Sequence, residues 1–401
     1  MYPHGMAVAL RSRVALAGAP LALLITGAHL ANDAFSNVLP VYLPTLQQRF
    51  ALGEVALASL VAVVSLSANV LQAFMGAITD RWGRRRSAAL GLLLSSVLMS
   101  FLAVAPTVWA LVAMLAIGGL GSAVFHPGAV AMMREVGERR SLAVGVFAAG
   151  GASGSAIMPV IALFVLREYG AQYLPWLSLV GVALAAALMW WAPASRRPVG
   201  SARPKLFDVT LFAGPVGLLS LAGILRATAF VSFSSAMPLY LVHVRGFAPD
   251  AAVIGATLAT YGFASATAGM LSGLLERRVG RVRLIVGSML LAAPVLAVVL
   301  TLAPGTLGYY AAVAVGAMLT NASVPLLVVS AQDLAPHAVG TASGMLMGFT
   351  WGIAGVAYIG FGAVQAWLGL APALVASFFF LWPAAVLAGV VLARQRARWM
   401  A

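Results

Sequence analysis

The chain has no cysteine and very little charge, and both shortages narrow what it can do. Without cysteine, disulfide bonds, thiolate metal sites and cysteine nucleophiles are excluded. Only 8% of the 401 residues are charged, whereas 62% are hydrophobic and the mean hydropathy is +1.00. Because a soluble domain carries about 25% charged residues, this composition excludes a soluble protein and indicates one that lies in a membrane.

Long apolar runs fill the chain and are separated by charged or Pro/Gly-marked breaks. A helix needs about 20 apolar residues to cross the hydrocarbon core, and the breaks define twelve such stretches. They are residues 15–46, 52–80, 87–105, 107–133, 141–167, 172–193, 207–242, 249–275, 284–303, 307–331, 338–366 and 370–393. We therefore predict an all-α membrane protein with twelve transmembrane helices, the first of them an uncleaved helix rather than a secretory signal.

The net charge of +14 would suit a nucleic-acid partner, but its distribution points to a membrane instead. With the N-terminus inside, 20 of the 24 lysines and arginines fall in the inner connections and termini. Three fall outside, namely Arg49, Arg167 and Arg245, and Arg226 lies within a span. This asymmetry is the positive-inside pattern, so both termini are predicted to be cytoplasmic and no nucleic acid is expected as a partner.

A basic motif bracketed by glycines occurs twice, 197 residues apart. The first copy is Gly76–Arg86 and the second is Gly273–Arg283. Because repetition on this scale indicates a duplicated unit, the chain is predicted to consist of two six-helix halves. The least apolar connection, rich in proline, arginine and serine, supplies the boundary. The predicted division is 1–193 for the N-terminal bundle, 194–206 for a cytoplasmic linker and 207–401 for the C-terminal bundle.

The first copy resembles the signature loop of the major facilitator superfamily of secondary transporters. That pattern runs Gly, any, hydrophobic, any, Asp, Arg, any, Gly, Arg, Arg, and it is matched by Gly76, Asp80, Arg81, Gly83 and Arg84. The resemblance implies two pseudo-symmetric bundles that rock about a central substrate site, with these five residues in conformational gating. The loop arginines equally serve as simple topological anchors.

The second copy of the motif departs from the family pattern. Glu276 comes one position early and Arg277 takes the acidic position. The resemblance implies that Asp80 in the first copy acts as a polar latch between neighbouring helix ends, and an equivalent second latch is not expected.

Three short segments resemble the fosmidomycin-resistance branch of this superfamily: His29–Asp33, Gly121–Pro127 and Ala331–Pro336. The resemblance implies a drug exporter of the bacterial cytoplasmic (inner) membrane that takes a small molecule and functions as a monomer. Helix 5 carries half of the superfamily's antiporter motif, in Gly145, Gly154 and Pro159. Glycines here also suit close helix packing, so this half-motif leaves both explanations open.

Few ionisable residues fall inside the predicted spans, and such residues normally face a cavity or a partner. His29 and Asp33 lie in the first predicted span (15–46, helix 1), His126 in the fourth (107–133, helix 4) and Arg226 in the seventh (207–242, helix 7). The resemblance implies that helices 1, 4, 7 and 10 line the central cavity. Because His29 and Asp33 are four residues apart, they share a helix face, and we assign them to proton coupling.

The repeat interval also relates His29 to Arg226, which is 197 residues later. Arg226, His126 and Asn321 are the candidate substrate-binding residues, because a guanidinium suits an anionic substrate. Gln332 and Asp333, at the inner end of helix 10, join the gating set. Three structural alternatives stay open: Asp33 pairs helices 1 and 7, Arg226 serves only structure, and His126 satisfies the backbone that Pro127 disturbs.

The leading hypothesis is a proton-coupled exporter of a small organic or anionic compound, such as a drug, that works by alternating access. The alternatives are an uncoupled or importing organic-anion facilitator and a lipid flippase. No nucleophile or metal-ligand motif accompanies the His29–Asp33 pair, so no enzyme activity, catalytic residue or metal site is predicted. A metal transporter through His29, Asp33 and His126 has only weak support. No cofactor is expected beyond the proton gradient.

Overall fold

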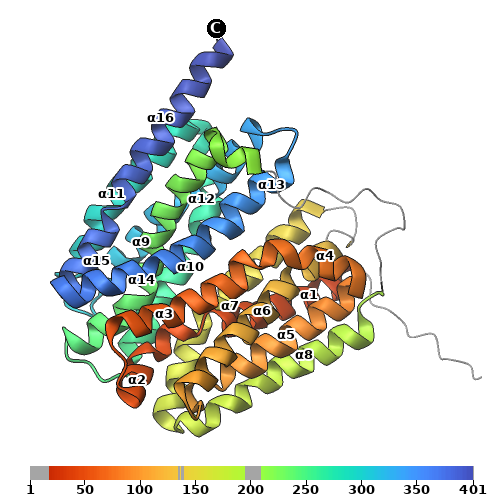
Figure 1. Cartoon of the computed structure of the whole chain (residues 1–401), viewed down its shortest axis with the longest axis vertical. Helices are drawn as coiled ribbons and strands as arrows, with labels where there is room; N and C mark the ends of the chain where they lie inside the picture. Colours follow the sequence, from red (N-terminus) through yellow and green to blue (C-terminus); the bar gives the residue numbers. More distant parts are fainter. Residues whose placement is uncertain (1–17, 134–135, 137–139, 195–208, 401) are drawn as a thin grey trace, which may run out of the picture.

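The structure is a computed structural model that describes residues 18–133, 136, 140–194 and 209–400, without the side chains of residues 73, 76–77, 80, 140–144, 209 and 396–400. Within these ranges it consists of helices and contains no strand (Figure 1). The N-terminal half contains α1 Gly18–Ser36, α2 Leu39–Phe50, α3 Glu54–Ser65, α4 Gln72–Trp82, α5 Arg84–Ser100, α6 Val108–Met133, α7 Arg140–Glu168 and α8 Ser178–Trp191. The C-terminal half contains α9 Pro215–His243, α10 Ala252–Val279, α11 Arg281–Val299, α12 Leu307–Leu334, α13 Val339–Gly344, α14 Thr350–Leu368, α15 Leu370–Phe378 and α16 Leu381–Met400.

These helices follow the twelve predicted spans. In the described ranges, nine spans are helices long and apolar enough to cross a membrane, from Val108–Met133 to Leu370–Gln395. The first three spans are shorter or interrupted. The stretch 15–46 is not one helix, since α1 ends at Ser36 and α2 begins at Leu39. Pro40 explains the break, because its ring would clash with the carbonyl four residues earlier, which is that of Ser36.

Two spans are interrupted by π-helical turns. One turn, Leu66–Val70, joins α3 to α4, and the other, Met345–Phe349, joins α13 to α14. Such turns are rare and concentrate at functional positions. The two turns lie against each other across the two halves, and a Cβ at Gly348 would lie 3.4 Å from the carbonyl oxygen of Asn69.

The two halves meet at one end and diverge at the other (Figure 1). We call the end that contains Phe50, Glu54 and Leu368 the closed end, and the end that contains Arg84 and Arg281 the arginine end. The contacts between the halves involve α2 with α9, α3 with α14 and α7 with α10. The ribbons separate toward α4 and α13, at the arginine end.

Glycine on α14 brings the halves into direct contact. A Cβ at Gly362 would lie 2.9 Å from the carbonyl oxygen of Glu54, and one at Gly355 would overlap the side chain of Ser65. Helices approach this closely in membranes when small residues face each other. The α3–α14 contact therefore depends on the absence of side chains at these positions.

Large apolar side chains cover the outside of the described bundle. Leu274 and Met270 on α10 are more than 70% exposed, as are Trp109 and Trp367 near helix ends. An apolar exterior with tryptophan near the ends of the spans is the surface that a bilayer requires. The predicted linker, 194–206, lies almost wholly outside the described residues, so its bounds stay a prediction.

Candidate functional site

Two histidines and one aspartate converge between α1 and α6. His29 Nε2 lies 3.1 Å from Asp33 Oδ2, and His126 Nε2 lies 3.2 Å from Asp33 Oδ1. The two Nε2 atoms are 3.3 Å apart. The His29 side chain is 8% exposed, while those of Asp33 and His126 are 18% and 20% exposed, so the cluster is buried on one side and accessible on the other.

The backbone fixes which nitrogen of each imidazole carries hydrogen. His29 Nδ1 lies 2.7 Å from the Phe147 carbonyl oxygen, and His126 Nδ1 lies 2.8 Å from the Ser122 carbonyl oxygen. A carbonyl oxygen only accepts, so both Nδ1 atoms donate, and in a neutral ring Nε2 is then an acceptor. The two Nε2 atoms and the two oxygens of the ionised Asp33 carboxylate are then all acceptors, and a contact between two of them becomes a hydrogen bond only when one of the two atoms carries a proton.

A second layer of polar groups holds Asp33 in place. Asn32 Nδ2 donates to Asp33 Oδ1 at 3.0 Å and to Ser122 Oγ at 3.0 Å. Ser95 Oγ donates in turn to Asn32 Oδ1 at 2.8 Å. This network joins α1, α5 and α6, and it leaves one carboxylate oxygen, Oδ2, to His29.

Helix α7 closes the cluster from a third side. The Phe147 ring stacks on His29 with 3.8 Å between centroids. Next to it, a Cβ at Gly151 would overlap His29 Cε1 and lie 2.5 Å from Asp33 Oδ2. Glycine at position 151 therefore leaves just enough room for the imidazole and the carboxylate to meet.

The same trio is the group, in the described part of the chain, whose ligand atoms lie close enough to hold a metal ion. One atom from each of His29, Asp33 and His126 lies within 4.8 Å of the others. The same three contacts become hydrogen bonds where one atom of each pair carries a proton.

The C-terminal half contains a second cluster, built around a buried guanidinium. Arg226 on α9 is 2% exposed, and its Nη1 donates to Asn321 Oδ1 on α12 at 3.3 Å. Its Cζ lies 4.6 Å from the ring centroid of Trp351. Asn321 Nδ2 also donates to Ser265 Oγ at 2.9 Å, so α9, α10, α12 and α14 all contribute.

Aromatic rings surround this guanidinium. Phe230 lies against Trp351 with 4.8 Å between centroids and against Tyr261 with 5.1 Å. Arg226 forms no ion pair with any carboxylate whose side chain the structure describes. Among the described residues, this buried cation therefore rests on aromatic faces and one amide oxygen and has no carboxylate as its counter-ion.

The structure groups the predicted residues differently from the sequence. His126, assigned to substrate binding, lies with Asp33 and His29, whereas Arg226 and Asn321 lie together in the other half. His29 and Arg226 share the repeat interval but no contact is found between them. Asp33 bonds within the N-terminal half rather than to Arg226. Trp351 was not predicted, although a tryptophan in the middle of a span, away from both membrane interfaces, is a usable signal.

The predicted gating residues lie at the arginine end. Gly83 separates α4 from α5 with φ +92°, a backbone conformation that favours glycine, and Gly280 repeats it with φ +87°. Arg81 lies in the last turn of α4, and Arg84 begins α5. The side chains of Gly76 and Asp80 lie outside the described residues, so the proposed Asp80 latch stays a prediction.

In the second copy of the motif, an ion-pair network ties three helices of one half together. Arg281 donates from Nε to Glu276 at 2.6 Å and from Nη1 to Asp333 at 2.6 Å. The neighbouring Gln332 donates to Ser343 Oγ at 2.8 Å. The early position of Glu276 therefore allows a pairing with Arg281 inside the C-terminal half.

Polar contacts at the closed end join the two halves and were not predicted. His243 Nε2 on α9 donates to Gln47 Oε1 on α2 at 2.7 Å, since an amide oxygen only accepts. Gln365 on α14 donates to Glu54 Oε2 on α3. Glu54 could have been singled out in the sequence as an acidic residue at the start of an apolar span, but nothing in the sequence identified Gln365 as its partner.

Comparisons with known proteins agree on the kind of protein. The family model described as "Major Facilitator Superfamily" matches residues 24–359. The chain is 29% identical over 371 residues to an uncharacterized MFS-type transporter, YfnC, of Bacillus subtilis (strain 168), covering 90% of each chain. It is 28% identical over 340 residues to the fosmidomycin resistance protein of Escherichia coli (strain K12), covering 83% of each.

Solved structures of low sequence identity share the fold. The nucleoside transporter NupG superimposes with a TM-score of 0.73 at 14% identity, covering 93% of this chain and 99% of that one. A bacterial homolog of the human lysosomal transporter Spinster, in an inward-facing and occupied conformation, gives a TM-score of 0.69 at 17% identity, covering 93% and 96%.

Proposed function

Because the chain belongs to the major facilitator superfamily, we propose that it is a proton-coupled exporter of a small anionic compound, working by alternating access. It is a multi-pass membrane transporter and not an enzyme. The finer proposal covers the coupling ion, the direction and the substrate class. Each of these rests on one feature of the chain.

The acceptor cluster of His29, Asp33 and His126 carries the proposal of proton coupling. Both Nδ1 atoms donate to backbone carbonyls, so the two Nε2 atoms and the two Asp33 oxygens are acceptors that need a proton between them to form hydrogen bonds. Asp33 takes up that proton when the site faces outward and releases it when the site faces inward. The partial exposure of Asp33 and His126 supports such an exchange.

The buried guanidinium of Arg226 supports an anionic substrate. It carries a positive charge with no described carboxylate beside it. The groups around it are polar or aromatic, namely Asn321, Trp351 and Tyr261. Carboxylate and phosphonate groups match the fork of donors on arginine. Since Arg226 is almost inaccessible in this conformation, substrate binding requires the side chains around it to move.

Charge distribution supports the orientation. The positive-inside pattern assigns the arginine end and both termini to the cytoplasm. With the halves in contact at the closed end, the conformation is then inward-facing. We further propose that the protein works as a monomer in the bacterial cytoplasmic membrane, binds no nucleic acid and needs no cofactor beyond the proton gradient.

Two relatives support export of a drug-like compound. One is named for fosmidomycin resistance, and a third relative, 26% identical over 242 residues, is multidrug resistance protein 1 of Bacillus subtilis (strain 168). Fosmidomycin is a phosphonate, so it is the first probe for the Arg226 site.

The test is fosmidomycin transport into proteoliposomes with and without an imposed pH gradient. We expect Asp33→Asn to reduce gradient-driven transport to the level of protein-free liposomes while substrate exchange without a gradient persists. Asp250→Asn, a matched change in the loop before α10, should transport like the wild type. Each assay is repeated with a chelator, and an unchanged wild-type rate is expected because protons occupy the cluster.

Other outcomes identify the alternatives. Equal gradient-driven transport by Asp33→Asn would overturn the coupling assignment. Flux that ignores the pH gradient in the wild type favours an organic-anion facilitator or importer. Translocation of a fluorescent phospholipid without transport of soluble anions favours a flippase.

A further inference from the structure

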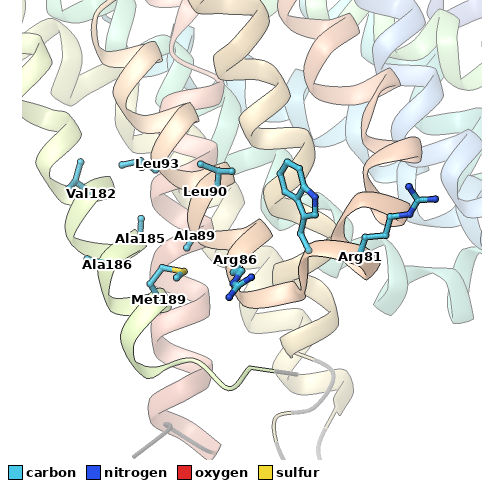
Figure 2. A pocket seen from close by; sticks show the side chains of 10 residues that line it. Arg81, Arg86, Ala89, Leu90, Leu93, Val182, Ala185, Ala186 and Met189 are labelled. Carbon is cyan, nitrogen blue, oxygen red and sulfur yellow. The ribbon is translucent and has the colours of Figure 1, made fainter. Parts of the chain in front are cut away.

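A cavity lies on the outer side of the N-terminal half, away from both polar clusters. Its volume is about 710 Å³, and it lies between α5, α8 and the end of α4 (Figure 2). Helices α5 and α8 pack against each other and against α1 and α6 of the same half. The cavity therefore belongs to neither the interface between the halves nor the proposed transport route.

Small residues form the deepest part of this cavity. Ala89 on α5 and Ala185 on α8 are buried. Larger apolar side chains border them: Leu90 and Leu93 from α5, and Val182 and Met189 from α8. Leu90, Leu93 and Met189 are partly exposed. The result is an apolar groove open to the hydrocarbon that surrounds the bundle.

Positive charge marks the arginine end of the groove. Arg86 and Arg81 both line it there; Figure 2 shows Arg86 next to Ala89, whereas Arg81 lies farther off with its guanidinium turned away from Arg86. Both side chains are exposed, and neither forms an ion pair or hydrogen bond with a side chain that the structure describes. Trp82, which is 53% exposed, completes this rim.

We propose that this groove binds an anionic phospholipid. The phosphate binds Arg86 and Arg81, and an acyl chain lies along Ala89, Leu93 and Ala185. Two exposed guanidinium groups that pair with no described carboxylate favour an anionic headgroup over a zwitterionic one. A free phosphate ion would not contact the apolar wall beyond these arginines. An acyl chain would, and burial of its hydrocarbon there would add to the free energy of binding.

The corresponding surface of the other half provides the control. The 197-residue interval relates Arg81 and Arg86 to Arg278 and Arg283, which are also exposed. It relates Ala89 to Val286, whose Cγ2 lies 3.0 Å from the place of a Cβ on Gly389 of α16. The charge is therefore repeated in the C-terminal half, whereas the position of the small Ala89 is taken by Val286, which packs against α16.

The experiment measures lipid retention by the full-length protein in native mass spectrometry after exchange into mixed micelles containing phosphatidylglycerol or phosphatidylcholine. The wild type should retain one phosphatidylglycerol in preference to phosphatidylcholine. Each lost arginine should weaken binding about fivefold, so Arg81→Gln/Arg86→Gln loses the retained lipid. Arg278→Gln/Arg283→Gln carries the same charge change and should keep it.

A second variant tests the groove itself and leaves both arginines in place. Ala186→Trp fills the apolar part, so it should also lose the lipid. If Ala186→Trp retains phosphatidylglycerol as well as the wild type does, the acyl chain does not lie in this groove and the proposal fails. Equal losses in the two arginine double variants would also overturn it, because they would indicate a general charge effect. Competition by inorganic phosphate in place of lipid would indicate a free-anion site and contradict the proposal.

Discussion

The two halves share a helical arrangement but differ in the side chains of their buried polar clusters. In the N-terminal half, two imidazoles and a carboxylate meet at 3.1–3.3 Å. In the C-terminal half, one guanidinium lies among aromatic rings and a single amide oxygen. His29 and Arg226 occupy related positions in the repeat, so duplication has preserved the place of an ionisable residue while its partners diverged.

This difference suggests that the two clusters perform separate tasks in transport. The N-terminal cluster consists of acceptor atoms that a proton would join, and the C-terminal cluster contains a cation with no described carboxylate beside it. In the proposed exporter, rocking of two such halves would carry a proton inward and a substrate outward at different moments. Changes in one half should therefore affect one of these tasks and spare the other.

The largest effect is expected at Arg226. Because hydrogen bonds to charged groups contribute about 1.5–3 kcal/mol, Arg226→Gln should raise the KM for an anionic substrate about 10- to 100-fold. Arg226→Lys keeps the charge but loses the planar contact with Trp351, so an intermediate KM is expected. Initial rates in proteoliposomes give both values. Unchanged KM values in both variants would remove Arg226 from the substrate site.

A methyl group at position 151 should disturb only the N-terminal cluster. Gly151→Ala places a carbon against His29 and Asp33, and overpacking of this kind costs about 1–3 kcal/mol. We expect a lower unfolding temperature and weaker gradient-driven transport, with the KM for an anionic substrate little changed. Gly269→Ala on α10 meets nothing within 4 Å and is the matched control. A wild-type coupling ratio in Gly151→Ala would contradict this assignment.

At the closed end, the contact between the halves should shift by a smaller amount. Gln365→Ala removes the hydrogen bond to Glu54, which contributes about 0.5–1.5 kcal/mol. Because the chain lacks cysteine, spin labels at Gln48→Cys and Leu368→Cys can report the separation directly. The variant should add a population at longer distances. A distance distribution identical to that of the parent would show that this bond does not hold the closed end.

The smallest effect is expected at the arginine end. Asp333→Asn removes one partner of Arg281, and since both side chains are partly exposed, the loss in stability should be about 0.2–1 kcal/mol. Glu276 still binds Arg281 in this variant. Thermal unfolding at low and high salt measures the difference, which salt should reduce. A loss that is larger and independent of salt would mean that Asp333 has another role.

The sequence predicted the helical spans and the family well, because hydrophobic runs and charged connections follow directly from the bilayer. It located the ionisable residues of both clusters on the right helices. It did not bring His126 to Asp33, because that contact depends on how α1 and α6 rotate about their axes when they pack. Trp351 and the Glu54–Gln365 bond were missed for the same reason, since each joins helices more than 100 residues apart.

The paired π-turns carry a consequence for how the halves move. A π-turn holds one residue more than an α-turn, so its conversion into α-helix would rotate the segment beyond it by about 100°. The two turns lie back to back between the halves, at residues 66–70 and 345–349. Helices α4 and α13 can therefore rotate about their axes independently of α3 and α14. The arginine end of each half then need not move as one rigid body with the closed end.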